Sequence, residues 1–128
     1  MKKKNTLLLF LCLFSLWAVA QEKKPVKIAC VGNSITYGSG IKNQFQNSYP
    51  GLLSQLLGEG YDVRNFGISA RVLLNKGDHP YMHEQKFRDL LAFQPDIVTI
   101  KLGTNDSKPW NWRYGKDFKK DLTEMLDI

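Results

Sequence analysis

Three short segments of the sequence carry residue types that serve acyl transfer. In chain order they are Gly32–Thr36, Asn65–Gly67 and Gly103–Asp106. A serine hydroxyl attacks an ester carbonyl only when a base takes its proton and hydrogen-bond donors stabilise the oxyanion. Ser34 is the candidate nucleophile. Its own N–H, the N–H of Gly67 and the side-chain amide of Asn105 are the candidate donors. The segments together predict the chemistry of ester hydrolysis.

Each segment follows a short run of residues that predicts a buried β-strand. The runs are Val26–Val31, Tyr61–Phe66 and Asp96–Leu102. Helical patterns lie between and after them, in Ser48–Leu57, Phe87–Phe93 and Gly115–Leu126. Strands that alternate with helices predict a parallel sheet with right-handed connections. The carboxyl ends of such strands meet at one edge, where α/β proteins bind ligands, so the three segments should converge there.

Capping residues predict where the first of these helices starts and stops. Ser48 is suited to cap the N-terminus, and Pro50 fits the first turn. Gly58 follows the last apolar position and should end the helix.

The ordered set of motifs resembles blocks one, two and three of the SGNH hydrolase superfamily, the GDSL-type esterases and lipases. The resemblance runs from about Lys27 to Asp106. It matches Ser34 to the nucleophile, Gly67 to the block-two glycine and Asn105 to the block-three asparagine. It implies a flavodoxin-like three-layer α/β/α fold with a parallel sheet, truncated here after the third strand. It implies no metal and no organic cofactor.

The sequence departs from the family pattern in two places. Asn33 stands where the family has the aspartate that gives the motif its name. The fourth block of the family, Asp-x-x-His, has no match in this chain. Because that block supplies the general base, we expect the chain to be an N-terminal fragment with little activity of its own.

The two histidines of the chain, His79 and His83, lie between the second strand and the helix that follows it. One interpretation makes one of them a substitute base or a metal ligand. The other, which we favour, makes both of them loop residues without a chemical role. Pro80 disturbs the helical spacing that a metal pair would need, and no further ligand cluster accompanies the histidines.

Residues 1–20 have the features of an export signal. Lys2, Lys3 and Lys4 form a basic start, an apolar stretch from Leu7 to Trp17 follows, and small residues precede a cleavage point after Ala20. The apolar stretch is shorter than the ~20 residues that a membrane span needs. We therefore expect a periplasmic or secreted protein without a membrane span in its mature part, and a partial SGNH hydrolase domain in residues 21–128.

The charge distribution indicates which partners the mature chain can have, and the cysteine count indicates the state of its thiol. The net charge of +6 includes three signal lysines, so fifteen basic and twelve acidic residues remain, a net charge of +3. They are scattered, which argues against nucleic acid as a partner. Cys30 would be the single mature cysteine, and its apolar strand predicts a buried, inert thiol.

An aromatic segment follows the Asn105 motif directly. Trp110 and Trp112 are candidate platforms for sugar rings, and Arg113 is a candidate partner for an acidic group. Alternatively, the tryptophans cover the edge of the core.

These features favour a serine esterase that removes O-acetyl groups from glycans. Within the family, the sequence looks most like exported carbohydrate acetylesterases, including sialate O-acetylesterases. A lysophospholipase or general short-chain acyl esterase is the alternative among enzymes. A non-catalytic phosphate or glycan binding module is the alternative outside them, because this fold also cradles phosphate at helix N-termini. Asn105 distinguishes the two classes, since an oxyanion hole uses it and a phosphate loop does not require it.

Overall fold

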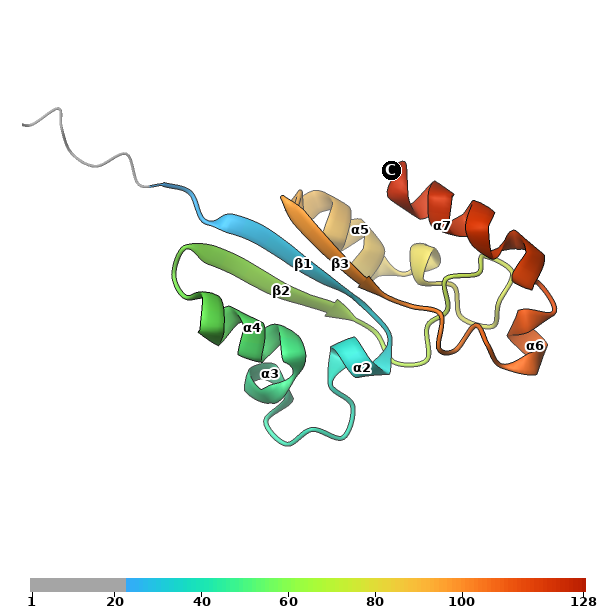
Figure 1. Cartoon of the computed structure of the whole chain (residues 1–128), viewed down its shortest axis with the longest axis horizontal. Coiled ribbons are helices and arrows are strands. Elements are labelled where there is room, and N and C mark those ends of the chain that lie inside the picture. Colours follow the sequence, from blue (N-terminus) through green and yellow to red (C-terminus); the bar gives the residue numbers. More distant parts are fainter. Residues whose placement is uncertain (1–22) are drawn as a thin grey trace, which may run out of the picture.

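Strand β1 (Val26–Gly32) lies in the middle of a parallel sheet. It pairs with β2 (Tyr61–Gly67) on one side and with β3 (Ile97–Lys101) on the other, which gives the order β2–β1–β3 (Figure 1). The three predicted strands and their parallel pairing are confirmed, within one residue at each end. The structure is a computed structural model that describes residues 23–128. The predicted signal peptide, residues 1–20, lies outside the described residues.

Helices cover both faces of the sheet, as the family resemblance implies. Helix α4 (Tyr49–Leu57) packs against β2 on one face. Helices α5 (Gln85–Phe93) and α7 (Phe118–Leu126) lie on the other face (Figure 1). The result is the predicted three-layer α/β/α arrangement. None of the helices within residues 23–128 has the length and apolar character to cross a bilayer.

The hydrophobic core lies between the sheet and helices α5 and α7. Successive residues of a strand point to opposite faces, so Ala29 and Val31 enter this core while Ile28 and Cys30 are buried on the other face. Cys30 is a buried free thiol, as predicted. The core cluster consists of Ala29, Val31, Phe66, Leu73, Tyr81, Phe87, Leu90, Phe93 and Met125.

The residues predicted to cap α4 lie at its ends, but only some of them play the predicted role. Pro50 lies in the first turn, and Gly58 ends the helix with a φ of +74° that favours glycine. Ser48 occupies the N-cap position, but its side chain makes no capping hydrogen bond, and its hydroxyl is buried without a partner in the described part of the chain. The prediction of a side-chain cap was therefore wrong, although the position was right.

Several short elements escaped the sequence patterns because each is about one turn long. They are the helices α2 (Ser34–Tyr37), α3 (Gln44–Asn47) and α6 (Pro109–Trp112), and the 3₁₀ turns η1 (Tyr81–His83) and η2 (Gly115–Asp117). Gly115 was predicted to begin the last helix, which instead starts at Phe118. A Cβ at Gly115 would lie 2.9 Å from the Trp112 ring, so this glycine allows a tight approach before α7 begins.

The outer edge of β3 has no strand beside it within residues 23–128. Ile97 and Val98 on this strand are 47% and 44% exposed. Because an unpaired apolar edge is a template for pairing with another chain, we expect residues 21–128 alone to self-associate. Sedimentation velocity over a range of concentrations should show this, and Val98→Lys should reduce it. A monodisperse monomer at high concentration would contradict the expectation.

Candidate active site

Ser34 is the first residue of α2, directly after the carboxyl end of β1. The start of this helix is fixed by Asn33, which is 1% exposed and whose Oδ1 accepts a hydrogen bond of 3.1 Å from the Ile35 N–H. The Asn33 N–H donates to the carbonyl of Lys101 at 3.3 Å, which ties the segment that contains Ser34 to the end of β3. Asn33 thus supplies the capping oxygen that an aspartate would supply, and this accounts for the first departure from the family pattern.

Gly67 ends β2 and pairs in register with Gly32 of β1. A Cβ at Gly67 would lie 2.3 Å from the backbone nitrogen of Tyr37, so only glycine lets β2 and the Ser34 helix approach this closely. Its N–H donates to Asn65 Oδ1 at 2.8 Å. The sequence predicted that this N–H would be free for an oxyanion, whereas in the structure it is already engaged. The role of Gly67 as a donor stays a prediction.

Tyr81 holds the adjoining end of β2 in place. Its hydroxyl donates to the carbonyl of Phe66 at 2.6 Å, and the residue is fully buried. Burial raises the pKa of Tyr81 far above its ordinary value, so the group stays a neutral donor at any physiological pH.

Asn105 lies in the turn that follows β3. Its side-chain Nδ2 donates to the carbonyl of Arg71 at 3.1 Å, which uses one of its two amide hydrogens. The backbone carbonyl of Asn105 accepts a hydrogen bond from Asn111 Nδ2 at 2.9 Å. The structure thus places Ser34 and Asn105 after the carboxyl ends of β1 and β3, and Gly67 at the carboxyl end of β2, as the sequence predicted.

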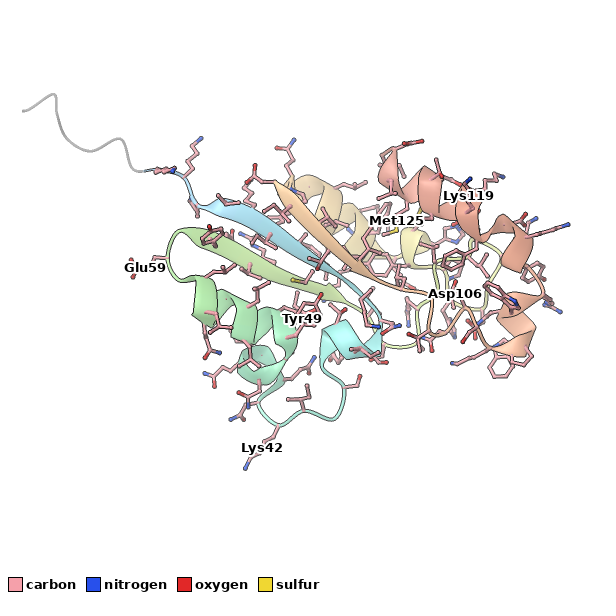
Figure 2. All side chains as sticks on the ribbon, in the orientation of Figure 1. Lys42, Tyr49, Glu59, Asp106, Lys119 and Met125 are labelled. Carbon is pink, nitrogen blue, oxygen red and sulfur yellow. The ribbon has the colours of Figure 1, made fainter. Side chains whose placement is uncertain are left out.

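Asp106, beside Asn105, organises the loop that follows β2. The carboxylate is fully buried, and its Oδ1 accepts from the N–H groups of Leu73 and Leu74, each at 2.8 Å. Its Oδ2 accepts from the N–H of Gly103 at 3.1 Å. Figure 2 labels Asp106 beyond the end of the sheet, beside this loop. Asp106 therefore holds its own turn at Gly103, and it also holds a loop more than thirty residues earlier in the sequence.

Replacing Asp106 should be costly for stability. Asp106→Ala leaves three N–H groups without an acceptor in a buried place, at about 1–3 kcal/mol each, so the free energy of unfolding should fall by roughly 3 kcal/mol or more. Urea unfolding of the full-length gene product measures this. Asp106→Asn keeps one acceptor oxygen and should lose less. Equal unfolding midpoints for the wild type and Asp106→Ala would refute the assignment.

Ala70 is a candidate that the sequence did not reveal. It precedes Arg71, the partner of Asn105, and has a φ of +68°, which is uncommon for a residue with a Cβ. Within residues 23–128 its N–H has no acceptor. Nothing in an alanine signals such a backbone conformation, so only the structure identifies this free donor.

The aromatic segment forms α6 and the residue after it. Trp110 and Trp112 are 55% and 54% exposed, so neither indole is a buried part of the core. Trp110 Nε1 donates to Asp78 Oδ2 at 3.1 Å, and the Trp112 ring lies 6.1 Å from the Phe118 ring. The Arg113 guanidinium lies 4.7 Å from the centre of the neighbouring Tyr114 ring. The segment presents aromatic surface to solvent near the Asn105 turn.

The histidines lie in exposed positions before α5. His83 closes the turn η1, and the carbonyl of His79 accepts from the Val72 N–H at 3.0 Å. Neither side chain has a hydrogen bond to Ser34 in the described part of the chain. Among residues 23–128, no group of three or more His, Cys, Asp or Glu side chains is arranged to hold a metal ion.

A cavity of about 910 Å³ lies along β2 and beside α3 and α4. Tyr37, Phe45 and Arg64 are among its lining residues, whereas Ser34, Gly67 and Asn105 are not. The cavity therefore borders the second motif at Asn65 but does not reach Ser34, Gly67 or Asn105.

Comparison with known proteins identifies the family. Residues 30–128 match the model of the GDSL-like Lipase/Acylhydrolase family. An acetylxylan esterase of Xylanibacter ruminicola is 55% identical over 107 residues, which are 84% of this chain and 22% of that protein.

Solved structures agree on the fold. The esterase AlinE4, of the SGNH-hydrolase family, has a TM-score of 0.58 at 23% identity, with 81% of this chain and 52% of that chain covered. A mutant of the same esterase has a TM-score of 0.60 with the same coverage. The chain spans about a fifth of the length of the curated relative and about half of the solved structures. The chain belongs to the GDSL-like lipase/acylhydrolase family.

Proposed function

We propose that this chain carries the nucleophile and part of the oxyanion hole of an exported carboxylic ester hydrolase that removes acetyl groups from glycans. The observation that carries the proposal is the placement of Ser34 and Asn105 after adjacent parallel strands, with Asn33 bonded to the end of β3. The family match and the acetylxylan esterase relative support an acyl ester as the substrate.

In the proposed reaction, Ser34 Oγ attacks the acetyl carbonyl, and a general base takes the Ser34 proton. The carbonyl oxygen becomes an oxyanion that accepts from the Ser34 N–H and from the second hydrogen of Asn105 Nδ2. Collapse of this tetrahedral intermediate breaks the C–O bond to the sugar, and the sugar oxygen leaves as a hydroxyl that carries a proton. The acetyl group stays on Ser34. Water then attacks the acetyl-serine, releases acetate and restores the hydroxyl.

The third oxyanion donor and the general base are the remaining parts of the proposed site. The third donor is either Gly67, whose N–H would first have to leave Asn65, or Ala70, whose N–H is free in the described chain. We assign the general base to a residue outside 23–128, because His79 and His83 lack a bond to Ser34 and the Asp-x-x-His pattern is missing from the sequence.

We assign the glycan part of the substrate to the aromatic segment. Trp110 and Trp112 offer exposed indole faces beside the turn of Asn105, and such faces stack on the apolar side of sugar rings. The relative named as an acetylxylan esterase makes an acetylated xylan the first substrate to test.

The test compares substrates and variants of the full-length gene product. We expect acetate release from acetylated xylo-oligosaccharides and p-nitrophenyl acetate, covalent labelling by a fluorophosphonate, and no release of fatty acid from lysophospholipid. Trp110→Ala should raise KM for the oligosaccharide by roughly 2- to 10-fold, the size of an aromatic stacking contact. Trp110→Phe keeps a ring and is the matched control. Hydrolysis of p-nitrophenyl acetate without any glycan deacetylation would replace the proposal by a general short-chain esterase.

A further inference from the structure

The strongest unexplained feature near the proposed site is the side chain of Asn111, which is 1% exposed although it is polar. Its Oδ1 accepts from the Asp78 N–H at 2.9 Å. Its Nδ2 donates to Asp78 Oδ1 at 3.0 Å and to the carbonyl of Asn105 at 2.9 Å. Both hydrogens and one lone pair of the amide are therefore used, and their partners leave a single possible orientation of the amide.

Asn111 touches both structures that set the direction of the Asn105 side chain. The first is the Asn105 backbone, which it holds at the carbonyl. The second is the loop after β2, whose Arg71 carbonyl accepts from Asn105 Nδ2. Asn111 fixes the far end of that loop at Asp78, while Asp106 fixes its middle. A substitution at Asn111 should therefore affect the direction of the Asn105 side chain both through the Asn105 backbone and through the loop that accepts from its amide.

Asp78 extends this contact to the protein surface. Its second oxygen, Oδ2, accepts from Trp110 Nε1 at 3.1 Å. Partial desolvation works to raise the pKa of Asp78, but the hydrogen bonds from Trp110 and Asn111, together with the neighbouring His79, outweigh it and hold this pKa below its ordinary value. The group is therefore a carboxylate at neutral pH and accepts both bonds.

We propose that Asn111 is a positioning residue for Asn105: through its bonds to the Asn105 carbonyl and to Asp78, it aims the free amide hydrogen of Asn105 at the oxyanion. This inference rests on the proposed function, in which Asn105 is an oxyanion donor. Its physical basis is that a donor stabilises the transition state only when its direction is preset.

The test is a double-mutant cycle between Asn111 and Asn105 in the full-length gene product, with p-nitrophenyl acetate as substrate. Asn111→Ala should lower kcat by about 10- to 10²-fold, the cost of a misplacement of about 1 Å, and change KM much less. In the Asn105→Ala background the same replacement should lower kcat no further, because the donor it positions is gone. Simple loss of stability would not produce that dependence.

Two further variants keep the test decisive. Asp78→Ala removes one partner of Asn111 at an exposed residue and should lower kcat by a smaller factor, even if Asn111→Ala does not fold. Asp121→Ala is the matched control, because the buried Asp121 holds the same loop at the Asn75 N–H, at 2.8 Å, without touching Asn105. It should lower Tm and leave kcat within a few-fold of the wild type.

The outcomes separate the inference from the proposed function. If Asn105→Ala lowers kcat but the effect of Asn111→Ala persists in full without Asn105, the positioning role is overturned and the proposed function stands. If Asp121→Ala lowers kcat as much as Asn111→Ala, the role is general stability and the inference fails. If Asn105→Ala leaves kcat unchanged, the oxyanion assignment and the positioning role fall together.

Discussion

Ser34→Ala should reduce ester hydrolysis by the full-length gene product on the order of 10⁶-fold in kcat, as expected when a nucleophile that works with its base is removed. The fold should survive, because the Ser34 side chain has no hydrogen bond within residues 23–128 and the cap of its helix comes from Asn33. Initial rates on p-nitrophenyl acetate measure the loss, and labelling by a fluorophosphonate should disappear with it.

A neighbouring serine provides the control for this prediction. Ser39 lies just after the end of α2 and shares a hydrogen bond of 2.7 Å with Ser69, so Ser39→Ala removes a hydroxyl from the same region. It should leave kcat within a few-fold of the wild type. Undiminished turnover by Ser34→Ala, with Tm unchanged, would remove the serine mechanism altogether.

Asn105→Ala should lower kcat by about 10²–10³-fold and change KM much less, because an oxyanion donor acts mainly in the transition state. The replacement also removes the bond to the Arg71 carbonyl, so Tm should fall slightly. Steady-state kinetics with p-nitrophenyl acetate separate the two constants.

A second loop asparagine serves as the control for Asn105. The Asn75 side chain donates to Glu124 at 3.1 Å on the other side of the loop, so Asn75→Ala removes an amide of the same kind without touching the proposed site. A rise in KM at constant kcat in Asn105→Ala would assign Asn105 to substrate binding instead.

The strands were predictable from the sequence because their signals are local. Val26–Gly32 is an apolar run that ends in glycine, Tyr61–Gly67 also ends in glycine, and the alternation with helices dictates parallel pairing. The placement of Ser34 and Asn105 follows from the same rule, since parallel strands bring their carboxyl ends to one edge.

Local backbone geometry and long-range contacts both contain details that the sequence did not reveal. Ser48 occupies the capping position, but its hydroxyl is buried and makes no capping hydrogen bond. The N–H of Gly67 is taken by Asn65, and the left-handed conformation of Ala70 has no compositional signal. The hydrogen bond between Asn111 and Asp78 joins residues that are 33 positions apart in the sequence. Hydrophobic periodicity cannot predict a contact of that kind.

The dependence of the loop after β2 on later residues has a consequence for synthesis. The side chains that hold Leu73 to Asp78 belong to Asp106, Asn111 and Asp121, which lie up to 46 residues after the backbone groups they bind. At translation rates of about 5–20 residues per second, roughly 2–9 s separate the emergence of the loop from that of its last anchor. During this interval the segment lacks its acceptors and is open to proteases and chaperones. Ribosome-bound chains stalled before Asp121 has emerged should be cut within residues 68–80, and chains stalled well beyond it should resist.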